Sequence, residues 1–160
     1  AQANREAVPL LQQEVLRALG AASRVLELFC GSGTLTLPLL GARSVTAVEN
    51  AGPSLALLRR SADEAQLGVR LIAGDAAEAA RGYTGPVDAV LLDPPRTGAA
   101  GVMAELRAPR IVYASCDAPT LARDGKLLAA RGYRLIRAVP LDLFPQTAHF
   151  EVVATFEARQ

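Results

Sequence analysis

Residues 24–34 read Arg-Val-Leu-Glu-Leu-Phe-Cys-Gly-Ser-Gly-Thr, and this stretch decides the fold. Its first six residues are mostly apolar and suit a buried strand, whereas the glycines after them suit a tight turn into a helix. Small residues at such a turn let a ligand approach the backbone, although the turn can also be purely structural. A dinucleotide fingerprint needs a third glycine where Thr36 stands, so a pyrophosphate site is disfavoured.

Strands and helices alternate on both sides of this turn. The apolar pattern predicts strands over 24–29, 44–49, 69–73, 87–92 and 111–114, with helices over 8–19, 35–40, 54–67, 102–107 and 121–131. Two longer segments, 133–143 and 148–156, follow each other without a helix between them. This order predicts an α/β protein: a doubly wound, mostly parallel, Rossmann-like sheet with an antiparallel hairpin at its C-terminal edge.

The composition excludes several classes of protein. The chain has 160 residues, 51% of them hydrophobic, and 17 basic against 16 acidic side chains, which predicts one globular domain with a net charge of +1. This charge does not by itself indicate nucleic-acid binding. Two cysteines cannot build a disulfide scaffold, one histidine cannot build a His-rich metal site, and no apolar run suits a membrane span. We therefore expect a cytoplasmic monomer without metal or membrane attachment.

Acidic residues and a thiol stand at the predicted strand ends, where open parallel sheets bind their ligands. Glu49 ends the second strand and could accept hydrogen bonds from both hydroxyls of a ribose, and Asp75 ends the third and could accept from an adenine amino group. Taken singly, each is equally well explained as a solvated acid or a helix cap. Together with Gly31 and Gly33 they describe a nucleoside site without phosphates, which suits S-adenosylmethionine.

The fourth and fifth strands end on groups that suit a reaction centre. Asp93 is followed by Pro94, Pro95 and Arg96, a rigid exit. Methyltransferases that act on exocyclic amines often have an aromatic residue where Arg96 stands, so its absence argues against amine methylation. Cys116 follows the fifth strand among polar residues, which suits a nucleophile, although a lone cysteine is more often buried and inert. For Cys30, next to the apolar end of the first strand, we expect that inert role.

Three further stretches, in order along the chain, carry a resemblance to a known family. Residues 93–98 read Asp-Pro-Pro-Arg-Thr-Gly, residues 113–124 read Tyr-Ala-Ser-Cys-Asp-Ala-Pro-Thr-Leu-Ala-Arg-Asp, and residues 144–151 read Phe-Pro-Gln-Thr-Ala-His-Phe-Glu. They resemble motifs of the RNA uracil-5-methyltransferases, which methylate C5 of uridine in tRNA or 23S-type ribosomal RNA. The residues at 2–4 and 26–33 resemble that family's Gln-x-Asn start and its cofactor turn.

The resemblance implies a class I methyltransferase catalytic domain over residues 1–160, with S-adenosyl-L-methionine as cofactor and RNA as partner. It implies that Cys116 is the nucleophile and Glu151 the general base, with Asp93 completing the catalytic set. The cofactor contacts that we expect, including the two glycines of the turn, are Gln2, Phe29, Gly31, Gly33, Thr34, Glu49, Asp75 and Asp93. Full-length members of the family carry an N-terminal RNA-binding domain and a central domain upstream, so we expect this chain to be one domain of a longer protein.

The chain also departs from the family's pattern. Asp117 and Ala118 stand where the family usually has Asn-Pro, and Phe150 replaces a common Val. A negative charge on Asp117 would raise the pKa of a neighbouring thiol. His149 lies two residues before Glu151 and shares its face on a strand, where it could contact RNA, orient a neighbour or simply make a structural hydrogen bond.

The implied chemistry explains why these groups are needed. Uracil C5 is a poor nucleophile until a thiolate adds to C6, and a base must then remove the C5 proton. Two alternatives stay open at this point. One is a methyltransferase with another substrate, in which Cys116 is incidental, and the other is a non-catalytic module that binds a nucleoside or RNA.

Overall fold

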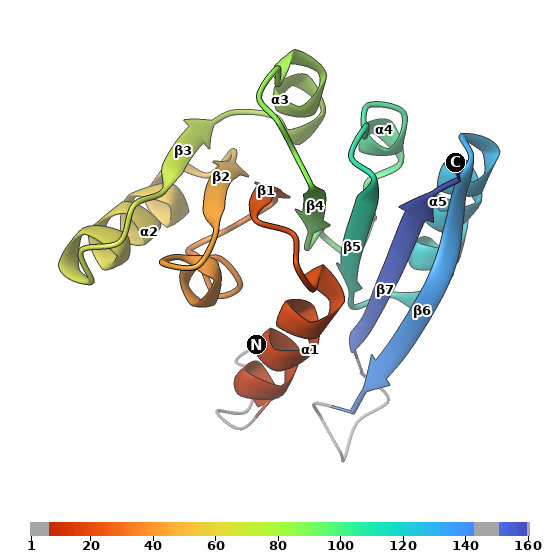
Figure 1. The fold of residues 1–160 in the computed structure, drawn as a ribbon, viewed down its shortest axis with the longest axis horizontal. Coiled ribbons are helices and arrows are strands. Elements are labelled where there is room, and N and C mark those ends of the chain that lie inside the picture. The colour runs from red at the N-terminus through yellow and green to blue at the C-terminus, as the bar shows by residue number, and fades with distance from the viewer. Residues whose placement is uncertain (1–6, 143–150, 160) are drawn as a thin grey trace.

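The computed structural model describes residues 7–142 and 151–159 of the chain (Figure 1). Their strands form one seven-stranded sheet in the order β3-β2-β1-β4-β5-β7-β6. The strands are β1 (Arg24–Leu28), β2 (Ser44–Glu49), β3 (Arg70–Ala73), β4 (Ala89–Leu92), β5 (Arg110–Ser115), β6 (Tyr133–Leu141) and β7 (Glu151–Ala158). The first five are parallel, and β7 runs antiparallel between β5 and β6. The predicted sheet with its antiparallel edge hairpin is therefore confirmed.

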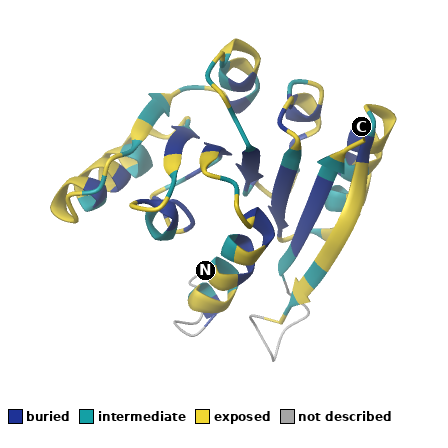
Figure 2. Ribbon diagram, in the orientation of Figure 1, coloured by how far each residue is buried: buried dark blue, intermediate teal, exposed yellow. Residues whose placement is uncertain are grey.

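Helices cover both faces of the sheet. One face packs against α1 (Ala7–Leu19), α2 (Gly52–Glu64) and the short 3₁₀ helix η1 (Leu37–Leu39), and the other against α3 (Ala76–Gly82), α4 (Ala100–Met103) and α5 (Ala118–Ala130). Figure 2 shows the central strands buried between these layers and the outer side of α2 exposed. The strands between the layers are apolar on both faces because each face packs on a helix.

The chain direction brings the carboxyl ends of β1, β2, β3, β4 and β5 to one edge of the sheet. After β1 the chain passes to β2 and β3 on one side, and later returns to β4 and β5 on the other. This change of direction lies at β1, and open α/β sheets bind their ligands beyond the carboxyl ends of the strands at such a point. The turn that follows β1 lies at this position.

Two helix predictions were wrong in detail, and one helix was missed. The helix predicted over 102–107 is α4 and ends at Met103. The segment 35–40 forms η1 rather than an α-helix, and Pro38 lies at its start, where proline removes a donor that a longer helix would need. The sequence analysis also missed α3. Its signal was present, because Asp75 accepts a hydrogen bond from the backbone N–H of Glu78, three residues later, as in a helix cap.

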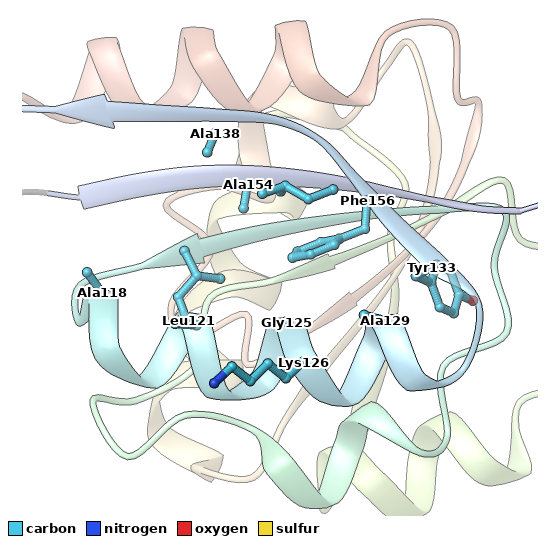
Figure 3. Close-up of a pocket in the computed structure, with 11 residues that line it drawn as sticks. Ala118, Leu121, Gly125, Lys126, Ala129, Tyr133, Ala138, Ala154 and Phe156 are labelled. Carbon is cyan, nitrogen blue, oxygen red and sulfur yellow. The ribbon is translucent and has the colours of Figure 1, made fainter.

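An open apolar pocket of about 360 Å³ lies between α5 and the β6–β7 hairpin (Figure 3). Figure 3 shows Leu121 from α5 and Phe156 from β7 beside it, and Lys126 is the charged residue of the described lining. The lining contains none of the predicted site residues. This pocket is therefore a gap in the packing of α5 on the hairpin and is separate from the carboxyl edge of the sheet.

Within residues 7–142 and 151–159, no helix combines the length and the apolar character that crossing a membrane requires. In the same part of the chain, no three Cys, His, Asp or Glu side chains form a group that could hold a metal ion.

Candidate active site at the carboxyl edge of the sheet

The turn after β1 has the backbone shape that its glycines suggest. Phe29, Gly31 and Gly33 have φ values of 61°, 57° and 99°, in the left-handed region. A Cβ built on Gly33 would collide with the side chain of Leu58 from α2, whereas one built on Gly31 meets nothing within 4 Å. Gly33 is thus required for close packing of the turn on α2, and Gly31 lies beside open space. Thr34, just beyond, is exposed, and its carbonyl accepts a hydrogen bond from Gln12.

Glu49 holds this turn from the end of β2. Its Oε1 accepts the backbone N–H of Gly31 at 2.9 Å, and its Oε2 accepts that of Ala51 at 2.7 Å. Each carboxylate oxygen has a second lone pair, so this arrangement keeps capacity for a further donor such as a ribose hydroxyl. Asp75, at the end of β3, caps α3 through Oδ2. The alternative explanation of Asp75 as a helix cap is therefore confirmed, and its role toward adenine stays a prediction.

Cys116 and Glu151 come together through the pairing of β5 with β7. The ladder pairs Ser115 with Val152, so the next residue of each strand, Cys116 and Glu151, stand opposite each other at its end. Their electrostatic coupling agrees, because the charge of Glu151 raises the pKa of the Cys116 thiol. Two residues that are 35 apart in the sequence thus meet at one edge.

The charges around Cys116 act in opposite directions. Cys116 is exposed as a residue, yet neighbouring atoms withdraw its thiol partly from water, and this burial is the main cause of its raised pKa. Glu151 and then Asp93 raise the pKa further. The guanidinium of Arg96 donates a hydrogen bond to the sulfur and lowers the pKa. The pKa of the thiol is therefore set by burial, by the two carboxylates of Glu151 and Asp93, and by the guanidinium of Arg96.

The two acids are also perturbed. Burial raises the pKa of Asp93 to about 7, and the charge of Glu151 contributes to the shift. Burial raises the pKa of Glu151 as well, and its buried Oε2 has no hydrogen-bond partner within the described residues. Carboxyl groups with raised pKa values at a cleft are characteristic of acid–base sites.

The structure bears on two further expectations, the effect of Asp117 on the Cys116 thiol and the inert role of Cys30. Asp117 does not act as the charge that raises the pKa of the thiol: the carboxylates with that effect are Glu151 and Asp93. Its own carboxylate instead caps α5 by accepting from Thr120, which lowers the pKa of Asp117. Cys30 is buried as expected, and burial raises its pKa to about 12, so it is unreactive.

Gln2 and His149, which the sequence also singled out, lie outside the described residues, as does the stretch 144–150. The sequence analysis missed Arg96 as a site residue, although it lies four residues after the end of β4 and its basic side chain stood in a quoted motif. It also missed Glu27, whose signal was a charged residue between the apolar residues Leu26 and Leu28. Glu27 is 1% exposed and accepts a hydrogen bond from Thr36.

Comparison with known proteins identifies the family of this chain. Residues 10–159 match the family described as tRNA (uracil-5-)-methyltransferase. The 23S rRNA (uracil(1939)-C(5))-methyltransferase RlmD of Pseudomonas putida is 46% identical over 153 residues, which cover 86% of this chain and 32% of the relative. RlmD of Pseudomonas entomophila is 44% identical over 170 residues, covering 98% of this chain and 37% of the relative. The chain thus spans about a third of the length of these relatives.

Solved structures show the same fold. The tRNA (uracil-54, C5)-methyltransferase of Pyrococcus abyssi, in complex with S-adenosyl-L-homocysteine, superposes with a TM-score of 0.85 at 26% identity, over 96% of this chain and 38% of that one. TrmN of Thermus thermophilus gives 0.70 at 25% identity, over 94% of this chain and 49% of that one. The methyltransferase fold is therefore confirmed. Because the family match extends over nearly the whole chain, this protein belongs to the tRNA (uracil-5-)-methyltransferase family.

Proposed function

We propose that this chain is the catalytic domain of an enzyme that transfers a methyl group from S-adenosylmethionine to C5 of a uridine in RNA. The observation that carries the proposal is the opposition of Cys116 and Glu151 across the end of the β5–β7 ladder, with Asp93 close enough to affect the ionisation of Cys116. A nucleoside-binding module without catalysis has no need for a thiol and two perturbed acids at one strand edge.

The residues at the edge fit the cofactor. The space beside Gly31 is open, and Glu49 and Asp75 end the two strands next to β1 on that side. We infer that Phe29, Gly31, Gly33, Thr34, Glu49, Asp75 and Asp93 hold S-adenosylmethionine, together with Gln2. When bound, the sulfonium supplies an electrophilic methyl group. The solved relative from Pyrococcus abyssi in complex with S-adenosyl-L-homocysteine supports S-adenosylmethionine as the cofactor.

The first step belongs to Cys116. Its thiolate adds to C6 of uracil and forms an S–C6 bond, and the electron pair of the C5–C6 double bond moves toward C5 and the C4 carbonyl oxygen. Arg96 favours the thiolate form through its hydrogen bond to the sulfur. Asp93 holds a proton up to about pH 7, so it is able to donate a hydrogen bond to an oxygen on which negative charge grows.

The last step belongs to Glu151. Once C5 carries the methyl group, the Glu151 carboxylate takes the C5 proton, the C5–C6 double bond forms again, and the S–C6 bond breaks to return the Cys116 thiolate. The raised pKa of Glu151 makes its carboxylate a stronger base than an exposed glutamate. General bases of this kind contribute typically ~10²–10⁴-fold to a rate.

For the substrate, we favour a uridine of 23S-type ribosomal RNA over tRNA. The RlmD relatives are 46% and 44% identical, whereas the tRNA enzyme of Pyrococcus abyssi is 26% identical. We further propose that the catalytic domain acts as a cytoplasmic monomer within a longer protein.

Covalent trapping tests the mechanism. This chain is mixed with labelled cofactor and a saturating RNA fragment at low salt, and the products are separated on a denaturing gel. Glu151→Gln keeps the shape of the side chain but loses the base, so we expect a methyl-labelled protein–RNA band that does not resolve. Cys116→Ala removes the nucleophile, so we expect neither product nor adduct.

Cys30→Ala is the matched control because Cys30 is the buried, unreactive cysteine. It should behave like the unsubstituted chain. Normal turnover by Cys116→Ala would exclude the proposed mechanism. Loss of methylated product with Cys30→Ala but not with Cys116→Ala would show that Cys30 is the nucleophile.

A further inference from the structure

The motif at residues 113–124 contains more polar groups than the proposed chemistry uses. Cys116 has a role in that chemistry, whereas Tyr113, Thr120, Arg123 and Asp124 have none. In the structure, all four belong to one hydrogen-bond network around the short loop 96–99, which lies between β4 and α4. This loop begins with Arg96, the residue that donates a hydrogen bond to Cys116.

Asp124 is the centre of the network. Its side chain on α5 is 0% exposed. Oδ2 accepts the hydroxyl of Tyr113 at 2.6 Å and the backbone N–H of Ala99 at 2.8 Å, and Oδ1 accepts the guanidinium of Arg123 at 3.1 Å. A buried carboxylate is tolerated when donors surround it in this way, and its loss leaves those donors without a partner. Asp124 therefore fixes the distal end of the loop to α5.

The first turn of α5 fixes the proximal end. Thr120 Oγ1 lies 3.0 Å from the carbonyl oxygen of Arg96 and also contacts the carboxylate of Asp117, so the single hydroxyl proton is shared between these two acceptors. Arg123 Nη2 donates to the carbonyl of Thr97 at 2.8 Å. Gly98 lies between these contacts with φ of 82°, and a Cβ built there would collide with Thr120 and Arg123. The close approach of loop and helix thus depends on a glycine at this position.

Helix α5 positions both Cys116 and Arg96, the two residues of the contact at the thiol. Cys116 precedes α5 by one residue, Asp117, whose carboxylate caps the helix. Arg96 reaches α5 through the loop contacts just described. We propose that Thr120, Arg123 and Asp124 form a clamp on residues 96–99 that sets Arg96 against Cys116, and that they act as positioning residues for the thiolate. The clamp deepens the proposed function, but its effect on the thiol can be measured without RNA.

The test is the pH dependence of alkylation of Cys116 by iodoacetamide, followed by mass spectrometry of the Cys116 peptide. Thr120→Val keeps the shape but loses the hydroxyl, and Thr120→Ser keeps the hydroxyl. With a loosened Arg96, the alkylation midpoint of Thr120→Val should rise by about half a pH unit or more, a roughly threefold loss of rate below the midpoint. Thr120→Ser should return the midpoint of the unsubstituted chain.

A second pair of variants acts at another point of the clamp. Arg123→Gln removes the bond to the Thr97 carbonyl and should also raise the midpoint. Lys126→Gln, one turn further along α5 and exposed, removes the same charge without contact to the loop. It should leave the midpoint unchanged.

Urea unfolding of each variant separates positioning from stability. If Thr120→Val and Arg123→Gln lower the free energy of unfolding but leave the alkylation midpoint where it was, the clamp is merely structural and the proposal is wrong. If Lys126→Gln shifts the midpoint as much as Arg123→Gln does, the effect is one of net charge, which also overturns it. Failure of methyl transfer to uracil would bear on the proposed function and leave this result intact.

Discussion

At the scale of single residues, Glu27 shows how burial creates a pH-dependent group. Its side chain on β1 is 1% exposed, and burial raises its pKa to about 8, with a smaller contribution from the charge of Asp93. The hydroxyl of Thr36 donates to Oε1 at 2.5 Å and opposes the shift. Thr36 stands where a dinucleotide site would have its third glycine. In this protein the residue at that position is buried and donates a hydrogen bond to Glu27.

This shift predicts a loss of stability as the pH rises. The folded state keeps the Glu27 proton up to about pH 8, whereas an unfolded glutamate releases it near 4.5. Between these values the folded state binds more protons, so the free energy of unfolding falls with rising pH. We expect Glu27→Gln, which stays neutral and can still accept from Thr36, to remove roughly 2–4 kcal/mol of that decline.

Urea denaturation at pH 5 and pH 8 measures this difference. Glu64→Gln on α2 is the matched control, because Glu64 is exposed. Its pH dependence should follow that of the unsubstituted chain. Parallel curves for Glu27→Gln and the unsubstituted chain would contradict the assignment. Asp93, whose pKa of about 7 lies in the same window, is present in all three proteins, so the difference measures Glu27 together with its coupling to Asp93.

At the scale of elements, the turn between β1 and η1 leaves no room for a side chain at Gly33. Gly33 has a positive φ and lies against Leu58 of α2, so a side chain there meets both backbone strain and a steric clash. We expect Gly33→Ala to lower the free energy of unfolding by roughly 2–4 kcal/mol, from the left-handed conformation together with overpacking. Chemical denaturation measures it.

Gly68 provides the comparison for that substitution. It lies between α2 and β3, its φ is not in the left-handed region, and a built Cβ meets nothing within 4 Å. Gly68→Ala should therefore change the stability by less than about 1 kcal/mol in either direction. Equal effects at the two glycines would show that the turn tolerates a side chain.

At the scale of the whole molecule, the balance of charge predicts weak binding to RNA. The net charge of +1 gives little overall attraction to the phosphate backbone of RNA. We expect the chain alone to contact one or two phosphates, so its affinity for an RNA hairpin should fall about tenfold or less between roughly 50 and 200 mM salt. A fluorescence anisotropy titration at several salt concentrations measures this slope.

The same titration has a clear contrary outcome. Tight binding to a single hairpin at physiological salt, with an affinity that falls steeply as the salt concentration rises, would show that this chain binds RNA strongly by itself. In that case the further two-thirds of the length of the relatives would not be needed for affinity.

The sequence by itself determined the local structure and the chemical inventory. Alternating apolar segments indicated the parallel sheet, since strands and helices bury their faces with different periods. Glu49, Asp75, Asp93 and Cys116 could be placed at one edge because the carboxyl ends of parallel strands share it. The inert role of Cys30 followed from its apolar neighbours.

The tertiary structure alone decided which of these groups meet. The opposition of Cys116 and Glu151 depends on the register of β5 with β7. The approach of Arg96 to the thiol depends on the clamp from α5. The raised pKa values of Glu27 and Asp93 depend on their burial. Local periodicity carries no information on pairs that are distant in sequence. Register, close approach and desolvation arise only when the whole sheet and its two helix layers pack together.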